Sequence, residues 1–286
     1  MSTFGGLYRQ GRRILDEAGV EGPGFEASRL FEKAFGADRQ ARILRAAEEA
    51  DPEAERAYLS MARERAGGRP LQYILGEWPF CGMSLLVGEG VLIPREETEL
   101  LVETAADMLA DVPAPRILDL CSGTGAVALA LGRAFPAAEV TAAERFPAAL
   151  DYLRRNRARL GASNVRPARL DVLDPAAAAG FSGLDCIVSN PPYVRSDELP
   201  TLQREVRREP AEALDGGEDG LLFYRAIAAR WLPALRAGGA LCVECGEGQA
   251  AAVARLFGRA GLGRIRFHRD FSGIERVVSG ERRGAR

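Results

Sequence analysis

Histidine is almost absent from this chain, since His268 is the only one among its 286 residues. That scarcity excludes metal centres built from several histidines. We also set aside serine–histidine–aspartate triads for the same reason. The chemistry must therefore run without a histidine base or a histidine-bound metal.

Cysteine is also scarce, and its five positions form no disulfide-scaffold pattern: residues 81, 121, 186, 242 and 245. Cys242 and Cys245 spell C-x-x-C within GALCVECG. Both lie on a predicted strand at a spacing that points their side chains to opposite faces of a sheet. We therefore expect buried structural thiols.

Long apolar runs are missing as well, because none approaches the roughly 20 residues that a membrane helix needs. The first stretch, MSTFGGLYRQGRRILDEAG, lacks an apolar core and a cleavage site, so we expect a cytoplasmic protein without membrane contact. Charge of one sign is not in excess, since 38 Lys and Arg oppose 40 Asp and Glu. This balance gives no support for a basic DNA-binding face, and we expect no stable nucleic-acid binding.

The first part of the chain is typical of helices joined by short turns. Apolar residues recur at helical spacing before Gly19 and again before Gly36. Asp51 is a predicted N-cap, with Pro52 at the first helical position of a third helix. The sequence therefore predicts a small helical domain over residues 1–72.

The next segments change character twice. PLQYILGEWPFCGMSLLVGEGVLIP is rich in strand formers and glycines, which predicts a hairpin linker over 73–94. After a predicted helix in REETELLVETAADMLADV, strands and helices alternate from Pro115 onward. Such alternation indicates an α/β domain over 95–286, with a largely parallel sheet, helices on both faces and an antiparallel closing pair.

A strand, a tight glycine turn and a helix follow one another in ILDLCSGTGAVALALG. Gly123 and Gly125 let the backbone approach a ligand where a Cβ would collide. Glu144 ends the next predicted strand, where a carboxylate can accept both hydroxyls of a ribose. These features fit a dinucleotide or S-adenosylmethionine; Asp119 suits the second better, because that cofactor carries positive groups and no phosphate.

Polar or small side chains stand at the carboxyl ends of four predicted parallel strands: Cys121, Glu144, Asp171 and Asn190. Ligands of open α/β sheets bind at this edge, so we expect these residues to border one crevice. Asp171 either accepts a hydrogen bond from an adenine amino group or caps the following turn.

The strand in IVSNPPYV must stop at Asn190, because Pro191 and Pro192 cannot donate to a sheet ladder. A planar amide offers two N–H donors, which the Asn190 side-chain carbonyl and the Pro191 backbone carbonyl can accept. Tyr193 can cover the flat group. In-line attack on a sulfonium methyl then needs mostly positioning, and no histidine base is required.

Six segments resemble one family along nearly the whole chain: RPLQYILG, LIPREETELLVE, ILDLCSGTG, IVSNPPYV, EPAEALDGGEDGLLFYRAI and SGIERVV. They are similar to the release-factor glutamine methyltransferases (PrmC/HemK). The resemblance implies a Rossmann-like class I S-adenosylmethionine-dependent methyltransferase domain joined by a β-hairpin to a small N-terminal helical domain. It also implies methylation of the glutamine amide nitrogen in the Gly-Gly-Gln tip of class 1 peptide-chain release factors. We expect a monomer.

Roles carry over by motif onto the matching positions. The implied cofactor loop comprises Cys121, Ser122, Gly123, Thr124 and Gly125, with Glu144 at the ribose and Asp171 and Val172 at the adenine edge, and Asn190 also beside the cofactor. The implied substrate pocket comprises Asn190, Pro191, Pro192 and Tyr193, of which Asn190, Pro191 and Tyr193 are catalytic. The chain departs from the family at four positions: Cys121 replaces a common glycine, Glu144 the usual aspartate, Glu96 a frequent proline and Val172 the aromatic of some relatives.

Three alternatives stay open at this point. A sister enzyme would methylate a glutamine of a ribosomal protein. An adenine-N6 methyltransferase would use the same Asn-Pro-Pro-Tyr, but it must extract the base and usually adds a basic module. A non-catalytic binding protein on the same fold is disfavoured by the intact glycine loop and Asn-Pro-Pro-Tyr.

Overall fold

The computed structural model describes residues 2–284 and divides into two compact units. One comprises the described residues up to Glu77 together with Gln203–Arg208. The other comprises Trp78–Leu202 and the described residues from Glu209 onward. None of the described helices has the length and apolar character needed to cross a bilayer.

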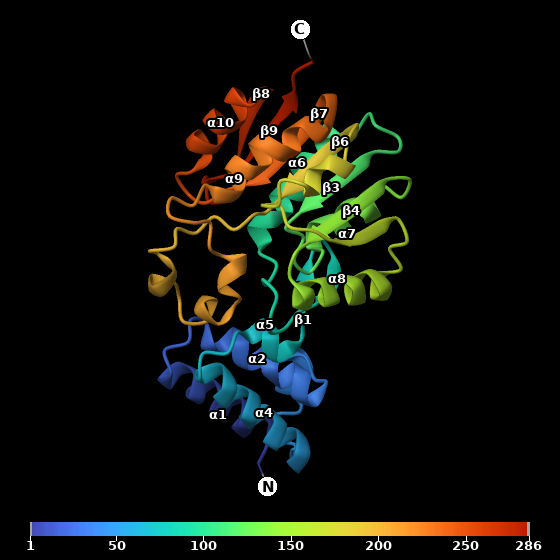
Figure 1. Cartoon of the computed structure of the whole chain (residues 1–286). Coiled ribbons are helices and arrows are strands. Elements are labelled where there is room, and N and C mark those ends of the chain that lie inside the picture. The colour runs from blue at the N-terminus through green and yellow to red at the C-terminus, as the bar shows by residue number, and fades with distance from the viewer. Residues whose placement is uncertain (1, 285–286) are drawn as a thin grey trace. The chain divides into compact units, whose positions relative to one another are not determined.

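The helical unit forms where its caps predict it (Figure 1). Its helices are α1 Phe4–Glu17, α2 Pro23–Phe35, α3 Arg39–Leu44, α4 Pro52–Ala66 and α5 Leu71–Leu75. Asp51 accepts hydrogen bonds from the backbone N–H groups of Glu53 and Ala54 at 3.0 and 2.9 Å, which confirms the predicted N-cap. Gly36 ends α2 at φ 61°, a conformation that glycine adopts without strain.

Helix α5 corrects the sequence prediction, which assigned PLQYIL to the strand-rich linker. Pro70 precedes the helix and Gly76, at φ 76°, ends it. Tyr73 and Ile74 favour strands, but both are buried, so packing against the other helices overrides their strand propensity.

The short segment Gln203–Arg208 belongs to the helical unit, which the sequence did not indicate. Arg65 is 5% exposed and forms ion pairs with Glu26 at 2.5 Å and with Glu205 at 3.1 Å. Arg204 donates to the backbone carbonyls of residues 66 and 67 at 3.1 and 2.9 Å. One buried guanidinium thus links a segment of the late chain to two early helices.

The predicted hairpin is present and short. Strands β1 Glu77–Phe80 and β2 Met83–Leu86 pair with each other. Cys81 and Gly82 make the turn with φ 45° and 68°, the left-handed conformations that match the twist of a tight hairpin.

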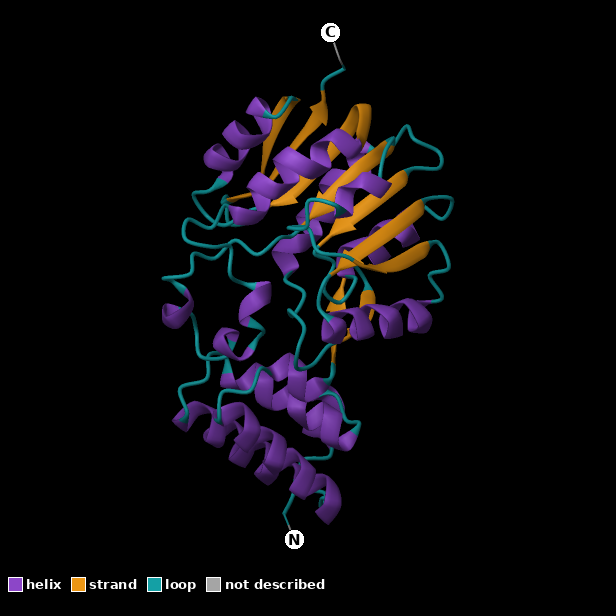
Figure 2. Cartoon of the chain, in the orientation of Figure 1, coloured by secondary structure: helices purple, strands orange, loops and turns teal. Residues whose placement is uncertain are grey.

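The second unit is built on a seven-stranded sheet of order β5-β4-β3-β6-β7-β9-β8 (Figure 2). Its strands are β3 Arg116–Leu120, β4 Glu139–Glu144, β5 Val165–Arg169, β6 Leu184–Ser189, β7 Leu235–Glu244, β8 Leu262–Arg269 and β9 Glu275–Arg282. The pairs from β5 to β7 are parallel, whereas β9 is antiparallel to both of its neighbours. The predicted α/β class and antiparallel closing pair are therefore confirmed.

Helices cover both faces of the sheet. One face packs against α6 Glu99–Met108, α7 Ala126–Ala134 and α8 Pro147–Leu160. The other packs against α9 Leu222–Ala226, its continuation to Ala234, and α10 Ala250–Arg259. Cys242 lies in the first apolar cluster and Cys245 in the second, both fully buried, so the predicted opposite-facing thiols are confirmed.

Asn156 of α8 joins three segments inside this unit. Its side chain is fully buried, donates to the carbonyls of Leu86 and Thr124 at 3.1 Å each, and accepts from the Leu86 N–H at 2.6 Å. The hairpin and the glycine turn after β3 are thereby fixed to one helix.

Replacing Asn156 should therefore be costly. Asn156→Ala leaves two buried carbonyls and one N–H without their partner, and we expect the free energy of unfolding to fall by about 3 kcal/mol. Arg155→Ala, on the exposed side of the same helix, should change it by less than about 0.5 kcal/mol. Urea denaturation of both variants measures the difference; equal midpoints would contradict this role of Asn156.

Candidate active site

A pocket of about 510 Å³ opens at the carboxyl edge of the parallel strands. Its walls come from the turns after β3, β4, β5 and β6, from segments 90–98 and 210–215, and from residues 222 and 223. The volume lies within the ~300–1,000 Å³ range of small-molecule sites.

The strand order explains why the pocket lies here. The chain runs from β3 outward to β4 and β5, then returns to place β6 on the other side of β3. The crossover from β3 to β4 and the crossover from β5 to β6 place the next strands on opposite sides of β3, which opens a crevice at its carboxyl end. Cys121 follows β3 and Asn190 follows β6, so these two residues border the crevice from adjacent strands.

The turn after β3 depends on left-handed backbone. Gly123 and Gly125 have φ 55° and 84°, and a Cβ on Gly125 would come within 2.2 Å of a Leu153 methyl carbon. Cys121 is also left-handed, at φ 62°, although it carries a side chain. Glycine would adopt the Cys121 conformation without strain, and nothing in the structure explains the cysteine.

Glu144 connects the second strand end to this turn. Its Oε2 accepts from the Gly123 N–H at 2.9 Å and its Oε1 from the Phe146 N–H at 2.8 Å. The side chain is 6% exposed, and burial raises its pKa despite these hydrogen bonds. Each oxygen keeps a second lone pair that a ribose hydroxyl can use.

Asp119 and Asp171 also border the pocket. Asp119 is 1% exposed and accepts from the Ala128 N–H at 3.2 Å; burial raises its pKa to about 7. Asp171 accepts from the Leu173 N–H at 2.9 Å, so it caps the following turn, and it also lines the pocket. Val172 beside it is buried, and its carbonyl accepts from Trp231 Nε1 at 3.0 Å.

The arginines that line the pocket are already paired. Arg145 forms an ion pair with Asp171 at 3.2 Å, and Arg95 with Glu209. The carboxylates that remain favour a ligand with hydroxyl donors and positive charge over a pyrophosphate. The donor set therefore fits S-adenosylmethionine, whose ribose and ammonium need acceptors.

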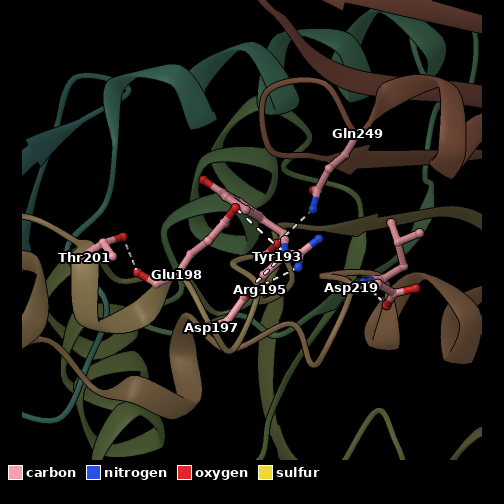
Figure 3. Close-up of polar contacts among 8 residues, drawn as sticks. Tyr193, Arg195, Asp197, Glu198, Thr201, Asp219 and Gln249 are labelled. Atoms are coloured by element: carbon pink, nitrogen blue, oxygen red, sulfur yellow. Dashed lines mark hydrogen bonds and ion pairs between the residues drawn. The ribbon is translucent and has the colours of Figure 1, made fainter.

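The Asn-Pro-Pro-Tyr segment forms the other side. Asn190 and Pro192 line the pocket, while Pro191 is buried. Tyr193 is partly buried outside this lining, and Gln249 at the start of α10 donates to its backbone carbonyl at 2.9 Å (Figure 3). On the exposed continuation, Arg195 forms an ion pair with Asp197 at 2.9 Å.

Several residues of the site were not predicted individually. Thr98 accepts a hydrogen bond from Asn190 Nδ2 at 3.1 Å. Glu209, 6% exposed, accepts from the Ile93 N–H at 2.9 Å and pairs with Arg95, which holds two pocket segments together. Both lie in the motifs LIPREETELLVE and EPAEALDGG, so the signal was the motif rather than any spacing. Among residues 2–284, no group of His, Cys, Asp or Glu has the arrangement of a metal site.

An alanine variant is usually more stable than the glycine variant at the same position. The left-handed backbone at Cys121 should reverse that order. Cys121→Gly should be about 1 kcal/mol more stable than Cys121→Ala, because only glycine adopts this φ freely. The matched pair at Cys186, a buried residue in the middle of β6, should show the opposite order by about 1 kcal/mol. Thermal unfolding of the four variants tests this; a Cys121→Ala protein that outlasts Cys121→Gly would refute strain at this position.

Comparisons with known proteins cover most of the chain. The family described as PrmC N-terminal domain matches residues 6–76, and the family described as Methyltransferase small domain matches residues 96–253. A protein of Geobacter sulfurreducens named Release factor glutamine methyltransferase is 41% identical over 271 residues, which cover 94% of this chain and 93% of that protein. The protein of that name from Deinococcus radiodurans is 40% identical over 282 residues, 97% of this chain and 98% of its own.

Solved structures share the fold of the chain at low sequence identity. The hMettl16 catalytic domain, in complex with MAT2A 3′UTR hairpin 6, matches with a TM-score of 0.57 at 15% identity, covering 81% of this chain and 82% of its own. The T. thermophilus 16S rRNA N2 G1207 methyltransferase matches with a TM-score of 0.50 at 21% identity, covering 72% of this chain and 50% of its own. The predicted class I methyltransferase fold is confirmed.

Proposed function

The chain belongs to the family of release factor glutamine methyltransferases, and we propose that it methylates the glutamine of the Gly-Gly-Gln tip in class 1 peptide-chain release factors. One observation carries the proposal beyond the family. The side-chain amide of Asn190, fixed by Thr98, borders the same pocket as the glycine turn and Glu144. A substrate amide and a methyl donor can therefore occupy one crevice.

The cofactor is S-adenosylmethionine, which when bound supplies a methyl group on a positively charged sulfur. We assign the turn Cys121, Ser122, Gly123, Thr124 and Gly125 to its backbone contacts. Glu144 accepts from the ribose hydroxyls with the lone pairs that the backbone N–H groups leave free. Asp119 faces the positive end, and Asp171 and Val172 border the adenine.

The acceptor side orients a poor nucleophile. The side-chain oxygen of Asn190 and the carbonyl of Pro191 accept the two N–H donors of the glutamine amide, which fixes its plane. Pro191 adds an acceptor without a competing donor. Pro192 lines the wall against which the amide rests, and Tyr193 follows it outside the lining. Positioning of this kind supplies most of the rate, because the alkylated nitrogen loses its proton without a dedicated base.

The helical unit is assigned to partner recognition. The residues given chemical roles all lie beyond residue 90, and the charge of the chain is balanced, at a net −2. A protein surface rather than a nucleic acid is the partner consistent with that balance. We propose a monomer of two domains, with the helical unit reading the release factor and the sheet unit transferring the methyl group.

Transfer of labelled methyl groups to purified release factor, ribosomal proteins and DNA in parallel tests the proposal. We expect label in the release factor, at the glutamine amide by mass spectrometry. Label in ribosomal protein or DNA alone would replace the proposal with one of the alternatives.

Asn190→Ala removes a preorganised acceptor whose bond should strengthen as the nitrogen changes hybridisation. We expect single-turnover methyl transfer at saturating cofactor to fall about 10²–10³-fold, with Asn190→Asp less impaired. As a control, Asn164→Ala removes an asparagine at the other edge of the sheet, bonded to the carbonyls of residues 132 and 135 at 2.9 and 3.1 Å. It should lower stability and leave turnover intact. An Asn190→Ala rate close to wild type would disprove the acceptor role.

Glu144→Ala should weaken cofactor binding by about 2–3 kcal/mol, since it removes a charged acceptor of two hydroxyls. The ribose contact persists from ground state to transition state, so saturated turnover should change less. Glu144→Gln keeps one acceptor oxygen and should lose less affinity. Isothermal titration with S-adenosylmethionine, together with single-turnover rates, gives both quantities; unchanged affinity with slow turnover would rule out the ribose assignment.

A further inference from the structure

The side-chain amide of Asn190 has two ends of nearly equal shape, a carbonyl oxygen and an NH2 group. Only the oxygen can accept a hydrogen bond from a substrate amide. An NH2 group in its place would oppose the substrate NH2 group and leave donors unpaired. Something in the protein must therefore decide which end of Asn190 faces the pocket.

Thr98 holds the NH2 end. Asn190 Nδ2 donates to Thr98 Oγ1 at 3.1 Å, across 92 positions of the sequence. Thr98 is 4% exposed and ends the 3-10 turn Glu96–Thr98 that leads into α6. With Nδ2 engaged in this way, the side-chain oxygen is the end that remains for the pocket, which both residues line.

Glu244 sets the direction of that hydrogen bond. A hydroxyl can donate or accept, so Thr98 alone would not select one end of the amide. Glu244 ends β7 and is 2% exposed, and its interaction with the Thr98 side chain lowers the pKa that burial raises. An ionised carboxylate only accepts. An interaction that favours the ionised carboxylate is a donation from the Thr98 hydroxyl, and the lone pairs of that hydroxyl then face Asn190.

We propose that Thr98 and Glu244 are positioning residues for methyl transfer, because together they hold the side-chain oxygen of Asn190 toward the substrate amide. The inference rests on the proposed function and adds two residues to it. Neither needs to touch the reacting atoms. Their effect is to give a chain of three side chains a single direction, from Asn190 through Thr98 to the carboxylate of Glu244.

The surroundings of Glu244 make this direction sensitive to pH. Burial raises the pKa of Glu244 to about 7. Its Oε2 has no hydrogen-bond partner among the described residues. The charged and titratable groups that face it are two cations, a carboxylate, two phenols and a thiol: Arg95, Arg276, Glu97, Tyr193, Tyr224 and Cys245. Burial raises the pKa of both phenols and raises that of the thiol to about 12, so all three stay neutral near pH 7.

Protonation of Glu244 weakens the selection. A carboxylic acid has an O–H to donate, and Thr98 can accept it and turn its own proton toward Asn190. Asn190 then meets a donor and is better paired with its oxygen toward Thr98, which places NH2 in the pocket. Because the acid is protonated below its pKa, methyl transfer should fall as the pH drops through about 7.

The first test separates the hydroxyl of Thr98 from its shape. Single-turnover methyl transfer to release factor, at saturating S-adenosylmethionine and pH 8, should fall about tenfold in Thr98→Val. Thr98→Ser keeps the hydroxyl and should recover most of that loss. Cofactor affinity should be the same in both variants. If Thr98→Val does not fold, Thr98→Ala takes its place, with circular dichroism as the check.

The second test uses pH. With one controlling group of pKa about 7, the wild-type rate at pH 6 should be about one tenth of that at pH 8. Glu244→Gln still accepts from Thr98 but does not titrate, so its slower rate should vary much less over this range. Any pH dependence of the rate that remains in Glu244→Gln comes from other titrating groups, such as Asp119.

The outcomes distinguish the positioning role of Thr98 and Glu244 from the proposed function on which it rests. A slow Thr98→Val variant, rescued by Thr98→Ser, with a flattened profile in Glu244→Gln, supports the positioning role. Wild-type-like transfer by Thr98→Val or Thr98→Ala, or the same pH profile in wild type and Glu244→Gln, overturns it even if Asn190→Ala is slow. Wild-type enzyme that transfers no methyl group to release factor refutes the proposed function itself.

Discussion

The pairing of β3 with β4 on one side and β6 on the other is the constraint on which the site depends. All three strands are parallel, so their carboxyl ends meet at one edge of the sheet. The glycine turn, Glu144 and Asn190 each follow or end one of these strands. A shift of one residue in either pairing would turn side chains to the opposite face and separate the glycine turn and Glu144 from Asn190.

Buried carboxylates line the pocket, and burial shifts their protonation. Asp119 has a pKa raised to about 7, and the pKa of Glu144 is raised as well. An acid whose pKa is higher in the folded than in the unfolded protein binds more protons when folded, so it lowers stability as the pH rises between the two values. Without a ligand, Asp119 therefore opposes folding as the pH rises from about 4 to about 7. A cationic cofactor favours the ionised form and offsets this cost.

Contacts between distant segments hold the loops that line the pocket. Asn156 bonds the hairpin and the glycine turn, Glu209 holds the segment at 93–95, and Gln249 holds the carbonyl of Tyr193. Loops without regular structure need such bonds, because a buried backbone group without a partner is costly. The helical unit is also held by a contact between distant segments, because Arg65 forms ion pairs with both Glu26 and Glu205.

The sequence by itself determined the α/β class, the caps of the early helices, the opposite-facing thiols and the strand ends at which the site lies. These follow from periodicity and from local backbone chemistry, which act over a few residues. The sequence misassigned Leu71–Leu75, where burial of Tyr73 and Ile74 outweighs their strand propensity. Only the tertiary structure decided that Asn190 meets Thr98 and that Thr98 meets Glu244. Hydrogen-bond direction and raised pKa values arise from burial among residues far apart in the chain, and no local pattern encodes them.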